Sequence, residues 1–470
     1  MNKLNSYFKI SERGSTFSRE IIAGIIVFIS MFYIIVVQGD IIGDGLAAES
    51  GMDPIVAAAT IGIVTALSAA IASILLGCYA NLPLSLASGM GVNAFISYTL
   101  IAGGMSFSAA LSAVLISGLI FILVSVTSIR SKILNSIPEE IRKAISIGVG
   151  FFLMYVAFTN TGIIGWGDPN STATFLGDLS NPVILLSFIS IFATIVLWLL
   201  DVKGGTLIAM IITILIGFIF MAITNSSSWG DDNDLSSLPS LNMDWSVYGE
   251  SFRGLNNVFG TSFKEFQNVD DTWKNPNWYL AIFILFLNDF FDTAGVVFGV
   301  TKLMQKDFEV DEKSSKRVLV VDALATTFGS MLGATNVTVY AESNAGIQYG
   351  GRTGLTAITT GILFLVAIPI IPLLAPLFTS SITVGAIVLV GIMMSSTLKD
   401  LRADDKVYFA SSIFTIIFMM LSYSIGTGIV IGLLTFIILM LITGRYKELD
   451  WVLLASSPMF LIFLILPMLI

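Results

Sequence analysis

The sequence predicts an all-α polytopic membrane protein with about fourteen transmembrane segments. Of its 470 residues, 55% are hydrophobic and only 12% are charged, which is roughly half the charged fraction of a soluble domain. The mean hydropathy is +0.90. Apolar windows long enough to cross a bilayer, roughly 17–25 residues, recur along the chain. The first window is too long for a cleaved signal, so we expect it to stay in the membrane.

The windows form two sets of seven. The first set comprises 20–38, 55–77, 82–100, 106–128, 138–160, 181–200 and 204–224. The second comprises 277–300, 318–334, 336–350, 354–378, 382–397, 407–422 and 425–443. Seven is odd, so the second set enters the membrane in the opposite sense, which is the pattern of an inverted-topology repeat. A last apolar stretch, 450–470, is either a further span or an interfacial tail.

Basic residues predict that the N-terminus is cytoplasmic, because cytoplasmic loops carry an excess of Lys and Arg. In this orientation, 20 of the 23 basic residues lie inside. The other three lie in 225–276, which we expect to be a solvated extracellular loop. The loops 39–54 and 161–180, also expected outside, have no basic residue. The sequence therefore predicts a multi-pass protein of the cell (plasma or inner) membrane.

Composition excludes several kinds of chemistry. The chain has no His and a single cysteine, Cys78, so a disulfide framework is impossible and proton transfer is left to carboxylates. The net charge of −9 gives no basic field for nucleic acid. No Walker-type loop indicates ATP-driven transport. We expect no cofactor apart from a coupling proton.

The third and tenth spans are short and rich in Gly, Ser, Thr and Asn. They read NLPLSLASGMGVNAFISYTL over 81–100 and GATNVTVYAESNAGIQYGGRTGL over 333–355. We expect each to combine an extended lead, Leu82–Leu86 or Val337–Tyr340, with a half-helix. Interrupted spans at matching places of the two halves are typical of transporter substrate sites. The alternative is close helix packing through small residues, but that leaves the polar Asn93 and Glu342 unexplained.

Several acids lie where no loop can solvate them. Asp292 and Asp289 are in the eighth span and Glu342 is in the tenth, while Asp322 begins the ninth and is expected to reach the cytoplasmic interface. Ionised acids at this depth cost about 2.5–3.5 kcal/mol, and unpaired carboxylates in one cavity favour the protonated form. The alternative is that each acid caps neighbouring backbone, most plausible for Asp322 and then Asp289.

The motifs together resemble one family. NDFFDTAGVVFGV, DALATTFGSMLGATNVTVYAES, GGRTGLTAITTG, GMGVNAF and ERGSTFSREIIAGI are similar to those of the AzgA-like adenine/guanine/hypoxanthine permeases, within the nucleobase–ascorbate transporter (xanthine/uracil permease) superfamily. The resemblance covers residues 12 to about 445. It implies a homodimer that takes up purine nucleobases by proton symport, with core and gate domains moving in an elevator-like cycle.

This resemblance also implies domain boundaries. The core domain comprises 20–128 (spans 1–4) and 277–378 (spans 8–11), and the gate domain comprises 129–224 (spans 5–7) and 379–445 (spans 12–14). The remaining parts are the cytoplasmic N-terminus 1–19, the extracellular loop 225–276 and the apolar C-terminal tail 446–470.

Carried over onto this sequence, the resemblance implies that Asp292, Glu342 and Asn93 bind substrate. Val296 stands where the superfamily often has a His, so that contact is missing here, and Ala341 leaves the purine preference open. The predicted substrate-binding residues are Asp292, Glu342, Asn93, Gly91, Ala341, Thr338 and Phe32. The predicted proton-coupling residues are Glu342, Asp292 and Asp289. Phe28, Phe95 and Phe291 are further candidates for stacking on a base, although packing is the commoner role of a Phe.

A purine fits such a site because its ring N–H groups can donate to a carboxylate, while a protonated carboxyl can donate to a ring nitrogen. Xanthine or uracil could use the same chemistry. A small anion would instead require central positive charge, and the predicted spans contain no Lys or Arg near their centres. An intramembrane aspartyl protease would require a GxGD-type setting, which is absent around Asp289, Asp292 and Glu342.

Overall fold

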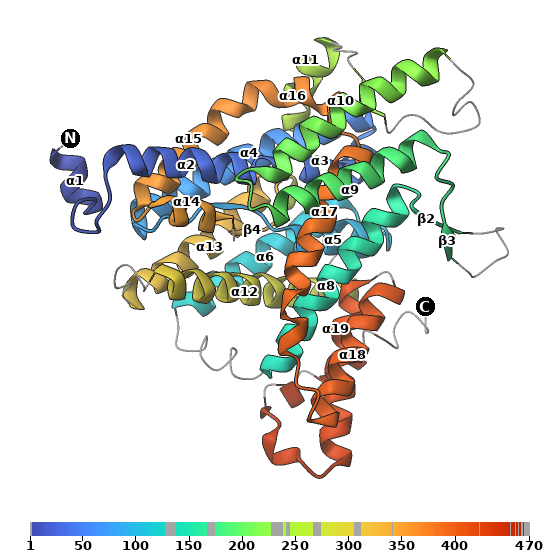
Figure 1. Cartoon of the computed structure of the whole chain (residues 1–470). Coiled ribbons are helices and arrows are strands. Elements are labelled where there is room, and N and C mark those ends of the chain that lie inside the picture. Colours follow the sequence, from blue (N-terminus) through green and yellow to red (C-terminus); the bar gives the residue numbers. More distant parts are fainter. Residues whose placement is uncertain are drawn as a thin grey trace.

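The protein is described by a computed structural model covering residues 2–126, 138–166, 174–226, 238–240, 245–266, 274–304, 312–340, 342–422 and 424–451, with parts of 453–464. It is mainly helical (Figure 1). The elements of the first half are α1 (Asn2–Phe8), α2 (Phe17–Met31), α3 (Tyr33–Ser50), α4 (Pro54–Tyr79), β1 (Leu86–Ser88), α5 (Met90–Ala94), the π-helical η1 (Phe95–Ile101), α6 (Phe107–Val126), α8 (Glu139–Asn160), β2 (Ile164–Trp166), β3 (Thr174–Leu176), α9 (Pro182–Leu199) and α10 (Gly205–Ser226).

Between the halves lie α11 (Trp245–Val258) and the 3₁₀ turn η2 (Thr261–Phe266). The second half consists of α12 (Pro276–Met304), α13 (Glu312–Leu332), β4 (Val337–Val339), α14 (Ser343–Tyr349), α15 (Gly354–Ala367), η3 (Ile368–Ile370), α16 (Ile371–Leu374), η4 (Ala375–Leu377), α17 (Ser380–Met394), η5 (Ser395–Asp400), α18 (Lys406–Leu421), α19 (Ile425–Ile442) and η6 (Tyr446–Glu448).

Each of the fourteen predicted spans coincides with a helix or with a strand followed by a short helix. Within the described residues, nine helices are long and apolar enough to cross a membrane, and Met90–Ile101 and Lys406–Leu421 are shorter apolar helices. The polytopic, all-helical fold class is therefore confirmed.

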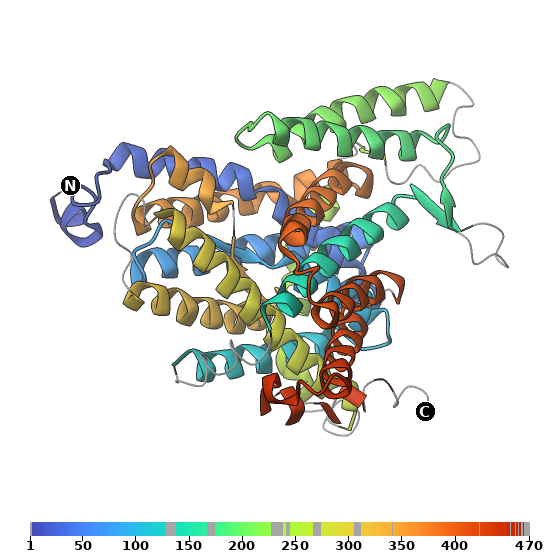
Figure 2. The ribbon, with the colours of Figure 1, turned by 60° about the horizontal axis from the view of Figure 1, so that its bottom comes forward.

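Most of the long helices gather into two groups by their packing. α4 packs against α3, α13 and α15, and α6 packs against α12 and α13. In the other group, α17 packs against α8 and α9, and α18 packs against α8 and α19. Figure 2 shows the blue helices α2 and α4 of the first group on one side and the green α9 and α10 and the red α18 and α19 of the second on the other. α3 touches α17 across the boundary.

The prediction that 39–54 is a loop is wrong. α3 continues the first span to Ser50 and ends at Gly51, which takes the left-handed conformation with φ +71°. The loop was predicted because one apolar window ends at 38 and the next begins at 55. Asp40 instead lies within the helix and lines a cavity, where a polar residue can be accommodated inside a span.

The segment 225–276 has more structure than a solvated loop. Within it, Gly254 of α11 fits against Met52 and Thr60, so that a Cβ at Gly254 would lie 2.6 Å from Met52 Cε. The Thr60 hydroxyl also donates to the Ser251 carbonyl at 3.1 Å. Beyond the last predicted span, the Phe460 ring packs 5.9 Å from that of Phe283, so part of the C-terminal tail contacts α12.

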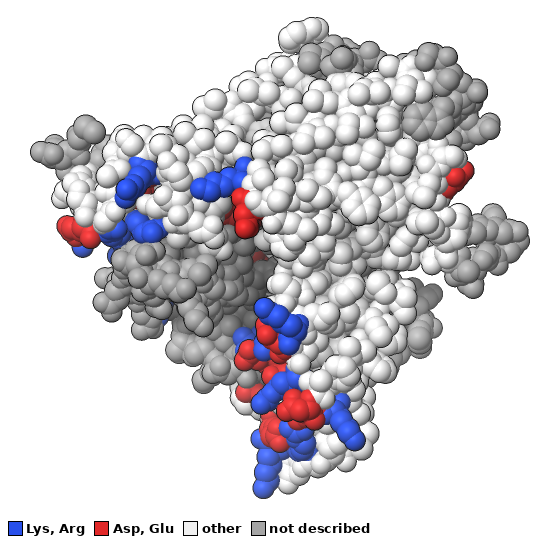
Figure 3. Space-filling view, viewed as in Figure 1, with Lys and Arg blue, Asp and Glu red and all other residues white. Residues whose placement is uncertain are grey.

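Charged residues occupy a limited part of the face shown in Figure 3, near α1 and α2, near the turn between α9 and α10 and around the loop before α18, with a further acidic spot at the right edge. The first three groups lie in segments predicted to be cytoplasmic. The surface over α9 and α10 is almost free of charge in this view, as expected for helices in contact with lipid.

Candidate functional site

The two interrupted spans meet through their strands. β1 and β4 pair antiparallel, with Ala87 opposite Thr338, and both strands are buried. Each strand leads into a short helix, α5 or α14, as predicted, although the first strand starts at Leu86 rather than Leu82. Gly89 ends β1 against the second half, where a Cβ would lie 2.7 Å from Asn336 Nδ2. Because the pair is antiparallel, α5 and α14 follow from its opposite ends.

Glu342 precedes α14 and lines a cavity of about 490 Å³. Its Oε1 accepts a 2.6 Å hydrogen bond from the hydroxyl of Tyr33, the first residue of α3. Tyr33 is only 2% exposed and lines the same cavity. The opposite wall includes Ala386 and Val390 of α17. A carboxylate with one oxygen fixed by Tyr33 is therefore presented to a cavity between the two helix groups.

The same cavity also has a basic residue, which the sequence did not suggest. Lys203, between α9 and α10, is one of its lining residues. The Nζ atom of Lys203 lies 5.0 Å from the centroid of the Tyr349 ring, a cation–π contact with α14. Trp198 and Gln348 complete the aromatic and amide lining.

Asn93 is completely buried and its polar atoms are engaged within the protein. Its Nδ2 donates to Gln38 of α3, and its Oδ1 accepts from Thr335 and, at 3.1 Å, from Ser88. Gln38 Nε2 in turn donates to Thr335 Oγ1 at 3.2 Å. This network joins the first, third and tenth spans, so in this conformation the position of Asn93 is set by protein contacts. Gly91, two residues earlier in α5, is buried as well.

Asp289 is almost fully buried beside β4. Its Oδ2 accepts from Thr326 Oγ1 at 2.6 Å, and its Oδ1 accepts from Asn336 Nδ2 at 3.1 Å. The Oδ1 atom of Asn336 is buried and has no hydrogen-bond partner among the described residues. Both oxygens of Asp289 therefore have donors within the first helix group.

Asp322 does not reach the cytoplasmic interface, and the alternative interpretation, a buried acid that caps neighbouring backbone, is confirmed. α13 begins at Glu312, six residues before the predicted window. Hydropathy missed this start because the first turns of the helix are polar. Asp322 is consequently inside the span and fully buried. Its carboxylate accepts from the Val339 backbone at 3.1 Å and from Thr293 Oγ1 at 2.5 Å. Thr293 also bonds Thr338 Oγ1 at 2.7 Å, which assigns Thr338 to this network.

The remaining predicted residues differ in what can be said of them. The side chains of Asp292 and Phe291 and the whole of Ala341 lie outside the described residues. The Phe28 ring contacts those of Phe32 and Phe364 edge-to-face, at 5.6 and 5.2 Å, and Phe95 is buried in the apolar core.

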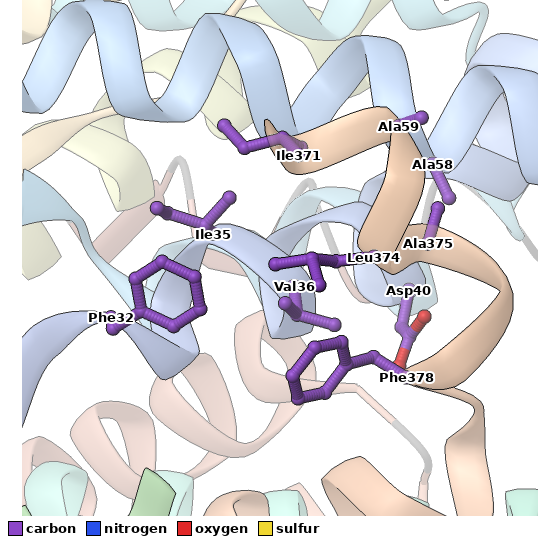
Figure 4. Close-up of a pocket in the computed structure, with 10 residues that line it drawn as sticks. All are labelled: Phe32, Ile35, Val36, Asp40, Ala58, Ala59, Ile371, Leu374, Ala375 and Phe378. Atoms are coloured by element: carbon purple, nitrogen blue, oxygen red, sulfur yellow. The ribbon is translucent and has the colours of Figure 1, made fainter. Parts of the chain in front are cut away.

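Phe32 lines a small, mostly apolar pocket of about 20 Å³, with Asp40 at its other end (Figure 4). The rings of Phe28 and Phe32 therefore serve packing in this structure.

Tyr33, Gln38 and Asp40 were not singled out from the sequence. All three lie on α3, in the segment FYIIVVQGD, and they contact Glu342, Asn93 and Thr383 respectively. The available signal was a run of polar residues in the first span, at 33, 38 and 40, which hydropathy alone assigned partly to a loop.

Comparison with known proteins gives a consistent result. The model of the Permease family (Xan_ur_permease) matches residues 18–431. Among curated proteins, the guanine/hypoxanthine permease PbuG of Bacillus subtilis is 33% identical over 468 residues, covering 98% of this chain and 99% of the relative. The adenine permease AdeQ of Escherichia coli K12 is 30% identical over 465 residues, covering 98% and 96%.

Solved structures share the fold at low sequence identity. The transmembrane domain of the cyanobacterial bicarbonate transporter BicA superposes with a TM-score of 0.60 at 14% identity, covering 86% of this chain and 97% of that one. Murine Slc26a9, an anion transporter captured in the inward-facing state, gives a TM-score of 0.56 at 11% identity, covering 91% and 69%.

Proposed function

Because the chain belongs to the permease family that matches residues 18–431, a family of multi-pass membrane transporters, we propose that it imports purine nucleobases by proton symport. Its curated relatives include guanine/hypoxanthine and adenine permeases. The observation that carries the proposal is Glu342, a carboxylate held by Tyr33 at the edge of a cavity between the two helix groups.

The chemistry of this cavity suits a neutral, flat heterocycle. With Oε1 engaged by Tyr33, the other oxygen of Glu342 can accept from a ring N–H group. A base with a mismatched donor pattern would leave buried polar groups unpaired, which costs about 1–3 kcal/mol. Asp292 is the second proposed substrate carboxylate, following the family motif. Gly91, Ala341, Asn93, Thr338 and Phe32 are proposed as further substrate-binding residues, also following the family motif.

Coupling to protons follows from the cost of moving a charge. A carboxylate that stays ionised resists passage through a low-dielectric barrier, whereas binding a proton together with a neutral base removes that penalty. We assign the proton to Glu342, with Asp292 and Asp289 as further carriers. In this cycle the core (20–128 and 277–378) moves with its base against the gate (129–224 and 379–445). A partner copy in a homodimer holds the gate, and the N-terminus lies in the cytoplasm.

Uptake by the full-length protein in proteoliposomes tests the proposal. We expect labelled hypoxanthine, guanine or adenine to accumulate when the outside is acidic, and a protonophore to abolish the accumulation. Labelled uracil and sulfate are tested in parallel as alternative substrates. Glu342→Gln keeps the shape of the side chain but cannot exchange a proton, so it should abolish accumulation while retaining insertion. Accumulation of sulfate but not of any purine would instead assign anion transport on the same fold.

A further inference from the structure

A second cavity, of about 550 Å³, lies between the two helix groups, and we refer to it as the Asp40 cavity. Asp40, Asp44 and Tyr98 line it from the predicted core, and Asn160 and Thr383 line it from the predicted gate. The proposed substrate chemistry at Glu342 uses none of these residues.

Two hydrogen bonds cross from core to gate at this cavity. The Thr383 hydroxyl of α17 donates to Asp40 Oδ2 of α3 at 2.7 Å. The Asn160 amide at the end of α8 donates to the Tyr98 hydroxyl of η1 at 3.2 Å. The rings of Tyr98 and Phe152 also meet edge-to-face across the same boundary, with centroids 6.4 Å apart. The boundary is therefore closed here by directional contacts.

The Asp40 cavity and the Glu342 cavity lie along the same pair of helices. On α3, Tyr33 lines the Glu342 cavity and Asp40 the other, and seven residues of α-helix separate them by about 10 Å along the axis. On α17, Ala386 lines the Glu342 cavity and Thr383 the Asp40 cavity. If the N-terminus is inside, the first span runs outward, so Asp40 lies closer to the outside of the membrane than Tyr33 does.

When the Asp40–Thr383 hydrogen bond opens, both side chains can still find other hydrogen-bond partners. Thr383 has two carbonyl acceptors on its own helix, at Thr379 (3.3 Å) and Ser380 (3.4 Å). Asp40 is half-buried at a cavity that can admit water. A buried hydroxyl with a second acceptor and a carboxylate that can be hydrated form a reversible contact.

Asp40 also lies beside the connection between the two groups. Figure 4 shows it next to Ala375 and Phe378, in the short stretch that joins α16 to α17. Any movement of α17 relative to α3 must change this stretch, so Asp40 is placed where the displacement of the gate begins.

We propose that Asp40 and Thr383, supported by Tyr98 and Asn160, form a latch that closes the route between the core and the gate on the Asp40 side. The latch breaks when the Asp40 cavity opens and re-forms when the Glu342 cavity is the accessible one. This proposal rests on the proposed two-domain transport but not on the identity of the substrate.

Thiol labelling of the full-length protein in sealed proteoliposomes tests the latch independently of transport. Cys78→Ser removes the native thiol, and Ala157→Cys adds a reporter, 3% exposed, in the wall of the Asp40 cavity. On this background, Thr383→Val removes only the hydroxyl. The matched control is Thr213→Val, because Thr213 is equally buried but bonds only the Ala209 carbonyl of its own helix.

We expect Thr383→Val to raise the rate of labelling by a membrane-impermeant maleimide at least fivefold, and Thr213→Val to leave it within twofold. Equal rates in Thr383→Val and the parent overturn the latch, and so does an equal rise in Thr213→Val, which would indicate general loosening. If Thr383→Val does not fold, Tyr98→Phe decides in the same way, with an expected rise of at least threefold. Because labelling needs no substrate, a failed purine-uptake assay leaves this test intact.

Discussion

The hydroxyl of Tyr33 lies 2.6 Å from Oε1 of Glu342 and joins residues 309 positions apart in the sequence. This bond connects the middle of the first span to the start of a half-helix in the other repeat. It fixes one carboxylate oxygen of a residue that lines the cavity. The orientation of the proposed substrate carboxylate is thus set by a residue of the first span.

Tyr33→Phe should weaken hypoxanthine binding about tenfold, because one hydrogen bond to a charged group contributes about 1.5–3 kcal/mol and the base can recover part of it. Binding to purified protein by calorimetry provides the measurement. Tyr7→Phe is the control, since the Tyr7 hydroxyl bonds the Cys78 carbonyl at an exposed position. Unchanged affinity in Tyr33→Phe would mean that Tyr33 does not position Glu342.

Asp289→Asn and Asp292→Asn should have different effects. Both oxygens of Asp289 accept from buried donors. The NH₂ group of an asparagine at this position would face one of these donors, which costs about 1–3 kcal/mol of stability. We expect Asp289→Asn to lower the Tm by several degrees, and Asp292→Asn to lower purine affinity more than Asp289→Asn does.

Thermal unfolding and ligand binding, measured on the same samples with the exposed Asp404→Asn as control, separate the two effects. A larger loss of affinity at position 289 would show that the family motif is aligned one helical turn away from the true site.

A crosslink between the core and the gate should stop transport. Ala58→Cys with Ala157→Cys, in the Cys78→Ser background, places thiols on opposite walls of the Asp40 cavity. A flexible bifunctional maleimide joining them should reduce purine uptake to background. Leu75→Cys with Phe328→Cys is the matched pair within the core, where both residues line one small groove, and its crosslink should leave uptake largely intact. Full uptake after a verified Ala58–Ala157 crosslink would contradict the moving-core cycle.

The ends of the last two spans are joined by an ion-pair cluster that predicts a pH dependence. Arg445 contacts Asp405 at 2.7 Å and Glu448 at 2.8 Å. Although desolvation opposes it, the hydrogen bonds from Arg445 and from backbone amides hold the pKa of Asp405 below its ordinary value. The hydrogen bond from Arg445 likewise lowers the pKa of Glu448.

Carboxylates whose pKa is depressed by folding stabilise the protein above their unfolded pKa of about 4, and this stability is lost as the pH falls through the folded pKa. Arg445→Gln should therefore lower the Tm by about 1–3 °C at pH 7 and by less as the pH approaches 4. Lys447→Gln removes the same charge nearby and serves as control. A Tm difference that persists undiminished at pH 4 would show that the cluster acts through packing instead.

Much of the architecture could be predicted because the bilayer imposes it. Spans must be long and apolar, so hydropathy placed all fourteen elements. The small and polar residues of 81–100 and 333–355 marked the two interruptions, because an irregular backbone is tolerated at that depth only where protein or water satisfies it. The motifs of the eighth, ninth and tenth spans indicated the permease family. These features are local, and each can be inferred from a single segment.

The tertiary structure decided which polar residues meet. Hydropathy placed Asp40 in a loop and Asp322 at an interface because it averages over each window. It contains no information on the cavity that accommodates Asp40 or on the strand that accommodates Asp322. The pairing of Tyr33 with Glu342, like that of Asp40 with Thr383, joins residues more than 300 positions apart. Such contacts depend on how the two repeats pack against each other. A polar residue in a span therefore signals from the sequence that a partner is needed, and only the fold selects the partner.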